Sequence, residues 1–211
     1  MSIFKKIFGR KEENPAPRNI RSVNDLQCGD MITINDSFAL PPQLRGQQMQ
    51  VQSVNSYDYD GDKELEWVLK GADDTLIFLS LDEDDGVSLE LSIKLKLADV
   101  ETLFDLDNFA DIFEDNDATT LIQTGDVERL SQWYTSSYRQ SNAGETGFFH
   151  KKDHRDKNTP LGKGEQFELF TLDDPEEDFG VCIEVWNDGE TDVSLTLYRP
   201  ASDIVDFFPG S

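Results

Sequence analysis

The sequence contains little of what most catalytic and metal sites need. Its 211 residues include two histidines and two cysteines. Cys28 and Cys182 are far apart in sequence and form neither a CxxC metal pair nor a multi-cysteine disulfide framework. We expect both to be buried thiols, since a free cysteine packs as a small apolar side chain. No stretch approaches the roughly 18 apolar residues of a membrane-spanning helix, and no apolar signal-peptide region is recognisable. The expected location is therefore the cytoplasm.

Positive charge is also scarce. The chain has 19 Lys and Arg residues against 43 Asp and Glu residues, a formal net charge of −24. A body this acidic is repelled by DNA, RNA and anionic lipid, so we expect no nucleic-acid partner. The charge divides unevenly, because residues 1–21 carry a net +4 and the remainder carries −28. The acidic part could attract cations or a basic protein partner.

The usual sequence signatures of chemistry are absent. Asp58, Asp60 and Asp62 have the opening spacing of a calcium-binding EF-hand loop, but the twelfth position is Leu69 where a bidentate glutamate is required. His150 and His154 are four apart, yet they lie in a basic segment that would repel a metal ion. There is no GxSxG nucleophile motif and no phosphate-binding glycine loop. We therefore predict no catalytic residue, no cofactor and no metal site, and a protein that is not an enzyme.

Apolar and polar residues alternate in many short segments, which is typical of half-buried β-strands. Strands are expected at residues 31–34, 49–59, 64–70, 75–81, 87–97, 148–150, 166–172, 179–186 and 192–198. Residues 98–104, 105–117 and 202–208 are expected to form short helices. Residues 126–138 fit either a helix or a strand pair, and we favour the strand pair. The predicted fold class is mainly β (α+β) with antiparallel sheets.

The first residues differ in character from the rest. On a helix, the apolar side chains would share one face and the basic ones would point elsewhere, as in an interfacial membrane anchor. The residues that would dock on a membrane or a partner are Ile3, Phe4, Lys5, Lys6, Ile7 and Phe8. A helix this short is marginal in water, so the alternative is a disordered leader or a tail docked on its own protein. Pro15 and Pro17 then indicate a linker, and we assign residues 1–21 to a basic leader and linker.

The remaining chain contains two similar halves. Val87-Ser88-Leu89-Glu90-Leu91 is matched by Val193-Ser194-Leu195-Thr196-Leu197, and an acidic, apolar segment follows each. Upstream, the segment 66–69 occupies the place of segment 168–172. We therefore predict two similar β units, 22–118 with acidic helices and 119–211 with a C-terminal helix, either side by side or fused in one pseudo-symmetric sheet.

The order of several features resembles that of bacterial β-rich domains of unknown function. These features are the Gly29-Asp30 start, the strand after it, the acidic hairpin, Glu66-Trp67-Val68-Leu69, the paired strands and the short acidic helix. Some of these are encoded near relatives of phage shock protein A, a membrane-stress protein. The resemblance covers residues 26–104 and 165–208. It implies an accessory role at the bacterial envelope, and it carries no catalytic residues.

These observations favour a non-enzymatic interaction or accessory protein with an unidentified protein partner. Its N-terminus would contact the inner face of a membrane, and the role would be linked to envelope stress. One alternative is an acidic mimic of nucleic acid, although the acidic residues are spread over many turns. Another is a small-ligand-binding, carbohydrate-binding or hydrolytic module that uses Trp67, Trp133 and Trp186 as stacking platforms.

Overall fold

The computed structural model describes residues 18–60, 62–83, 86–114, 118–155 and 163–210. Within them the chain is mainly β, and its strands join in one antiparallel sheet. The strands are β1 (Met31–Ile34), β2 (Gln48–Tyr59), β3 (Asp62–Lys70), β4 (Leu76–Asp82), β5 (Ser88–Lys94), β6 (Thr120–Ile122), β7 (Ser137–His150), β8 (Glu165–Asp173), β9 (Phe179–Trp186), β10 (Thr191–Pro200) and β11 (Ile204–Phe208). The predicted antiparallel, mainly β class is confirmed.

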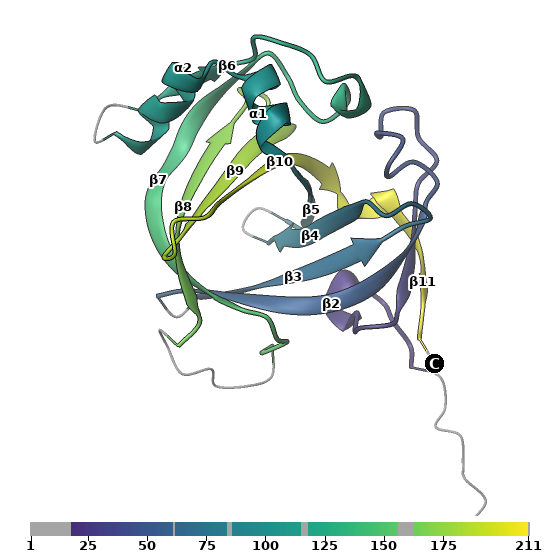
Figure 1. Cartoon of the computed structure of the whole chain (residues 1–211). Helices are drawn as coiled ribbons and strands as arrows, with labels where there is room; N and C mark the ends of the chain where they lie inside the picture. The colour runs from purple at the N-terminus through teal and green to yellow at the C-terminus, as the bar shows by residue number, and fades with distance from the viewer. Residues whose placement is uncertain (1–17, 61, 84–85, 115–117, 156–162, 211) are drawn as a thin grey trace, which may run out of the picture.

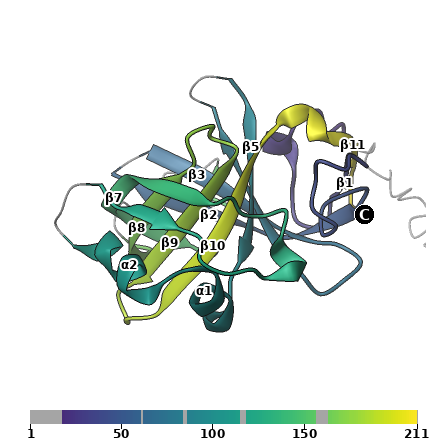
Figure 2. The same cartoon turned by 90° about the horizontal axis from the view of Figure 1, so that it is seen from above.

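Eight of these strands close into a barrel. The ladder runs β2-β3-β4-β5-β10-β9-β8-β7, and β7 returns to pair with β2, where Tyr57 lies opposite Phe149. Figure 1 shows the strands curving around this ring. β1 and β11 extend the sheet beyond β2, and β6 extends it beyond β7. Figure 2 shows β1 and β11 on one side of the ring and α2 on the opposite side.

Each half of the chain contributes the same kind of unit to this ring. β2–β5 and β7–β10 are both four-stranded antiparallel meanders, and the two meanders meet at the β5–β10 and β2–β7 pairs. A short strand precedes each meander, β1 beside β2 and β6 beside β7. The strands of the two halves therefore lie in one continuous sheet.

The two faces of the sheet differ sharply, because polar and apolar residues alternate along its strands. Strand β5 shows this alternation. Its polar face has Ser88, Glu90, Ser92 and Lys94, and its apolar face has Leu89, Leu91 and Ile93. The apolar face forms the hydrophobic core of the described chain, where these three side chains are at most 4% exposed. The polar face lines the inside of the ring.

Two short helices and a long connection cover part of the apolar face. α1 (Leu97–Leu103) and α2 (Leu106–Ala110) lie close together beyond one end of the strands (Figure 1). The carboxylate of Asp105 accepts hydrogen bonds from the backbone N–H groups of Asp107 and Asn108, and so caps α2. Such a cap satisfies backbone donors that a helix leaves without partners at its N-terminus.

Three sequence predictions were wrong in detail. Residues 202–208 do not form a helix, because a 3-10 turn (Ala201–Asp203) leads directly into β11, which pairs with β1. Residues 126–138 do not form a strand pair, since they contain a 3-10 turn (Glu128–Leu130) and irregular structure before β7 begins. β6 was not predicted, and it is only three residues long.

The predicted correspondence between segments 66–69 and 168–172 is displaced by one position. The Glu66 side chain is buried inside the ring, whereas Glu168 is exposed on the outside. A shift of one residue moves a strand's side chains to the opposite face. The match of Leu89 and Leu91 with Leu195 and Leu197 is consistent with the structure, because all four belong to the apolar core.

Candidate functional site

The barrel encloses a polar lumen of about 210 Å³. Its lining side chains come from seven of the eight ring strands, which places it inside the ring. Among the described lining residues, Glu64, Glu66, Glu90 and Glu184 are acidic and Lys94 is the one basic residue. The lumen therefore has an excess of negative charge, part of which is carried by the buried residues Glu66 and Glu184. Such groups are costly to bury unless they are paired or protonated.

A hydrogen-bonded cluster lies at the wider end of the lumen. The Asn55 side-chain amide donates to Glu66 Oε1 at 2.8 Å, and the Tyr57 hydroxyl lies 3.3 Å from Glu66 Oε2. Tyr57 also bonds to Glu184 from the opposite wall of the barrel. The Tyr57 hydroxyl has one proton, so it can donate to only one of the two carboxylates at a time.

Burial changes the titration of these acids. It is the main cause that raises the pKa of Glu184 to about 7, against which the charge of Lys94 and the hydrogen bond from Tyr57 act. Burial likewise raises the pKa of Glu90 to about 7, and the nearby acids Glu64, Asp82 and Asp173 add to it. The pKa of Glu66 is also raised by burial, although the Asn55 hydrogen bond opposes the rise. Glu184 and Glu90 are therefore groups that can exchange protons near neutral pH.

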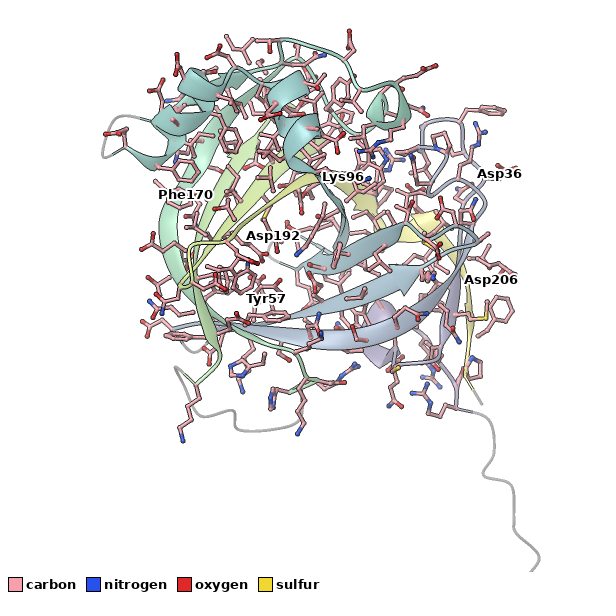
Figure 3. The ribbon with its side chains drawn as sticks, in the orientation of Figure 1. Asp36, Tyr57, Lys96, Phe170, Asp192 and Asp206 are labelled. Atoms are coloured by element: carbon pink, nitrogen blue, oxygen red, sulfur yellow. The ribbon has the colours of Figure 1, made fainter. Side chains whose placement is uncertain are left out.

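Lys94 forms an ion pair inside the barrel mouth. Its Nζ lies 2.6 Å from Asp192 Oδ2 and 5.1 Å from the centre of the Phe78 ring. Burial alone would lower the pKa of Lys94, but the hydrogen bond to Asp192 and the charges of Glu184, Asp192 and Glu66 raise it overall. Figure 3 labels Tyr57 and Asp192 within the ring of strands. The Asp192 carboxylate and the face of the Phe78 ring thus both bind the Lys94 ammonium group.

The mouth of the lumen is a cavity of about 630 Å³ lined by aromatic as well as charged side chains. It shares Tyr57, Glu66, Phe78 and Lys94 with the lumen, so these four side chains border both spaces. Where β2 meets β7, the rings of Tyr57, Phe149, Phe167 and Trp186 pack against one another, with centroids 5.1 to 5.6 Å apart. Of these, Tyr57, Phe149 and Trp186 line the mouth.

One polar atom in this mouth has no partner. Asn55 is 5% exposed, and its Oδ1 makes no hydrogen bond to the protein. The donation from Nδ2 to Glu66 fixes the orientation of the amide and leaves Oδ1 as the acceptor without a donor. A buried acceptor without a donor costs stability, and such atoms are uncommon in folded proteins. The mouth therefore offers an acceptor that a bound molecule could satisfy.

The aromatic residues considered from sequence have different positions. Trp67 and Trp133 are 1% and 0% exposed and belong to the apolar core, so neither is a stacking platform. Trp186 lines the mouth of the lumen, and its indole N–H donates to Asp192 Oδ2 at 3.3 Å. Of the three tryptophans, only Trp186 is placed to contact a molecule in the barrel.

The cysteines and histidines also differ from one another. Neither cysteine is a fully buried thiol, which corrects the sequence prediction: Cys28 is exposed, and Cys182 is partly exposed and lines the lumen. The His150 and His154 rings are 5.2 Å apart in a T-shaped contact. Within the described ranges, no three His, Cys, Asp or Glu side chains are arranged to hold a metal ion.

The predicted docking residues, Ile3 to Phe8, lie outside the described residues, so their role remains a prediction. No helix in the described part of the chain is long and apolar enough to cross a membrane. The lumen site was not predicted from the sequence. The sequence pattern that could have indicated this site is the alternation of acidic with large apolar residues, as in Glu64 to Lys70 and Ser88 to Lys94. The inward-facing acids of these strands are not uniformly exposed, since Glu66 is buried and Glu90 is half-buried, and a buried glutamate is unusual.

Comparison with known proteins gives one match. Residues 43–201 match the family model described as Domain of unknown function (DUF4178). This segment begins shortly before β2 and ends just after β10, so it coincides with the eight-stranded barrel. No curated protein and no solved structure matches the chain. The prediction of a domain-of-unknown-function family is confirmed.

Proposed function

Because this chain belongs to the DUF4178 family, whose description names no activity, we propose its function from the barrel that defines the match. The proposal is a non-enzymatic accessory protein that works by binding a small polar molecule in the lumen. The observation that carries it is the unsatisfied Oδ1 of buried Asn55, which faces a polar cavity of ligand size. Ligand sites in proteins are concave, partly aromatic and equipped with a few convergent polar groups, as this one is.

The arrangement favours binding over catalysis. Carboxylates of raised pKa line the lumen. Its one cysteine among the described lining residues is Cys182, and this thiol is disfavoured as a nucleophile, because burial raises its pKa well above the usual range. A thiol reacts as the thiolate, so a raised pKa makes it inert near neutral pH.

The proposal can be tested by a thermal-shift screen with small polar amines, sugars and carboxylic acids. A molecule that binds the folded state raises the melting temperature. We expect at least one class to do so and to change Trp186 fluorescence, a signal that Trp186→Phe would remove. Ser194→Leu, which fills the lumen from β10, should abolish the shift, whereas Glu168→Gln on the outside should not. Absence of any shift, or a shift that persists in folded Ser194→Leu, would reject the proposal.

A second candidate function concerns the N-terminus, and it is favoured by the +4 charge of residues 1–21 against −28 for the rest. Residues 3–8 would dock this accessory protein on the inner face of an anionic membrane, in a role linked to envelope stress, and the acidic body would face a basic protein partner. In a flotation assay with anionic vesicles, the full chain should float and a chain lacking residues 1–11 should not. Equal behaviour of the two would exclude this docking role.

A further inference from the structure

The lumen already contains one ammonium group, which shows how the barrel holds a cation. Lys94 Nζ is bound by the Asp192 carboxylate at 2.6 Å and lies over the Phe78 ring. A carboxylate and an aromatic face are a known combination for binding ammonium ions, because the ring quadrupole adds to the attraction of the carboxylate. This pair accounts for one positive and one negative charge.

Among the described residues, neither Glu66 nor Glu184 forms an ion pair of its own, and both share the field of Lys94, which is paired with Asp192. Glu66 lies in the same mouth, where Trp186 provides an aromatic ring, and its charge is among the causes that raise the pKa of Glu184. These two carboxylates share one hydroxyl donor, that of Tyr57. After Lys94 has paired with Asp192, the wall around Glu66 still has an excess of negative charge.

The orphan acceptor identifies the kind of hydrogen-bonding group that is missing. Asn55 Oδ1 requires a donor, and the two Glu66 oxygens, each of which accepts one hydrogen bond, can accept a further one. A neutral hydroxyl could satisfy the amide but would leave the charge uncompensated. A metal ion would need a set of oxygen ligands converging on one point, and the described side chains include no such group. A primary ammonium group has three donors and a positive charge, and it meets both requirements.

We infer that the lumen binds a small organic cation through a primary ammonium group, which donates to Asn55 Oδ1 and to the Glu66 carboxylate beside Trp186. This inference rests on the proposed function, since it names the class of molecule that the same cavity would bind. The mouth accommodates the organic part of the ligand against Phe149 and Trp186.

The test is isothermal titration calorimetry of the full chain with a matched pair of probes, putrescine (1,4-diaminobutane) and 1,4-butanediol. They have the same carbon chain and differ in ammonium against hydroxyl groups. We expect putrescine to bind at one site, and the diol to bind at least tenfold more weakly. Glu66→Gln, which keeps the shape and removes the charge, and Asn55→Leu, which removes the acceptor, should each weaken putrescine binding at least tenfold.

Glu168→Gln is the matched control, because it removes the same charge from the outer face of the barrel. Its affinity for putrescine should equal that of the unchanged chain. Equal affinities for the amine and the diol would overturn the inference, and so would unchanged binding by Glu66→Gln or complete displacement by magnesium chloride at matched ionic strength. If Asn55→Leu does not fold, Glu66→Gln decides the result.

The two proposals fail in distinguishable ways. Suppose that the diol or a sugar binds, that this binding is lost in Ser194→Leu, and that putrescine does not bind. This result would support the proposed function and reject the ammonium ligand. No heat with putrescine also rejects the ammonium ligand, and the thermal-shift screen with Ser194→Leu then decides the proposed function separately.

Discussion

The carboxylate of Asp30 accepts a hydrogen bond of 2.7 Å from the backbone N–H of Gly210, which is 180 positions further along the chain. The same carboxylate forms an ion pair with Arg18 and accepts a hydrogen bond from the backbone N–H of Gln27. Asp30 is 1% exposed. One buried side chain therefore joins the two ends of the described chain, next to the β1–β11 pair that extends the barrel wall.

Replacing Asp30 with alanine should lower the free energy of unfolding by about 2–3 kcal/mol, because it removes charge-assisted hydrogen bonds and leaves buried donors without an acceptor. Urea unfolding monitored by circular dichroism measures the change. Asp206→Ala provides the control, since Asp206 is exposed on β11 (labelled in Figure 3) and should change stability by less than about 0.5 kcal/mol. A similar small effect at Asp30 would contradict this role.

The lumen acids predict that stability falls as the pH rises. Glu184 and Glu90 each have a pKa of about 7 in the folded barrel against an ordinary value of 4.5. Between these values the folded state retains protons that the unfolded chain has released, so the free energy of unfolding decreases from about pH 5 to pH 8. Each group contributes up to about 3 kcal/mol to this decrease, at 1.36 kcal/mol per pKa unit.

Urea unfolding of Glu184→Gln at pH 5.5 and pH 8 tests this dependence. The groups that face Glu184 are Tyr57, Glu66, Lys94 and Asp192, and the substitution leaves them in place. We expect the variant to gain stability at pH 8 and to show a weaker pH dependence than the unchanged chain. Glu168→Gln changes the net charge equally but should keep the original dependence. Parallel curves for both variants would show that overall charge, rather than the lumen, determines the effect.

The alternation of polar and apolar residues was sufficient to predict most of the strands. Segments such as Ser88 to Lys94 contain a complete polar-apolar alternation, and each lies where the pattern placed it. The pattern failed at residues 202–208, because apolar residues with one acidic residue between them fit a helical turn as well as a strand. The choice of β11 depends on pairing with β1, which is about 170 positions away in sequence and invisible to local reasoning.

The candidate site was harder to predict for a related reason. Asn55 and Glu66 lie opposite each other on the neighbouring strands β2 and β3, but Glu184 lies on β9 and reaches them only because β2 closes the ring with β7. Sequence spacing carries no information on this closure. The acidity of the chain also concealed the site, since buried Glu66 and exposed Glu168 are equally plausible surface residues when the direction of each side chain is unknown.

Closure of the ring depends on a glycine in β7. A Cβ atom at Gly147 would lie 2.4 Å from Phe167 Cζ and 2.8 Å from Tyr59 Cε1. Phe167 is 1% exposed and cannot move into solvent easily. Gly147→Ala should therefore destabilise the protein by about 1–3 kcal/mol, the usual cost of overpacking a core.

Gly71→Ala is the matched control for Gly147→Ala, because a Cβ there meets its nearest neighbours at 3.5 Å, an ordinary contact. Its melting temperature should be unchanged or slightly higher, since alanine reduces the freedom of the unfolded chain. Equal melting temperatures for the two variants would show that the rings of Phe167 and Tyr59 can repack, and that β7 does not need a glycine at this position.

The two cysteines should report whether the barrel stays closed. Cys28 is exposed, with its Sγ 3.1 Å from the carbonyl oxygen of Gln52, whereas Cys182 lines the lumen, where burial raises the pKa of its thiol. Because the thiolate is the reactive species, we expect Ellman's reagent to modify one thiol per chain rapidly at pH 8 and the second only in denaturant. Cys28→Ser should lose the rapid phase. Two rapid phases in the folded protein would contradict this prediction and show that the lumen admits a reagent of this size.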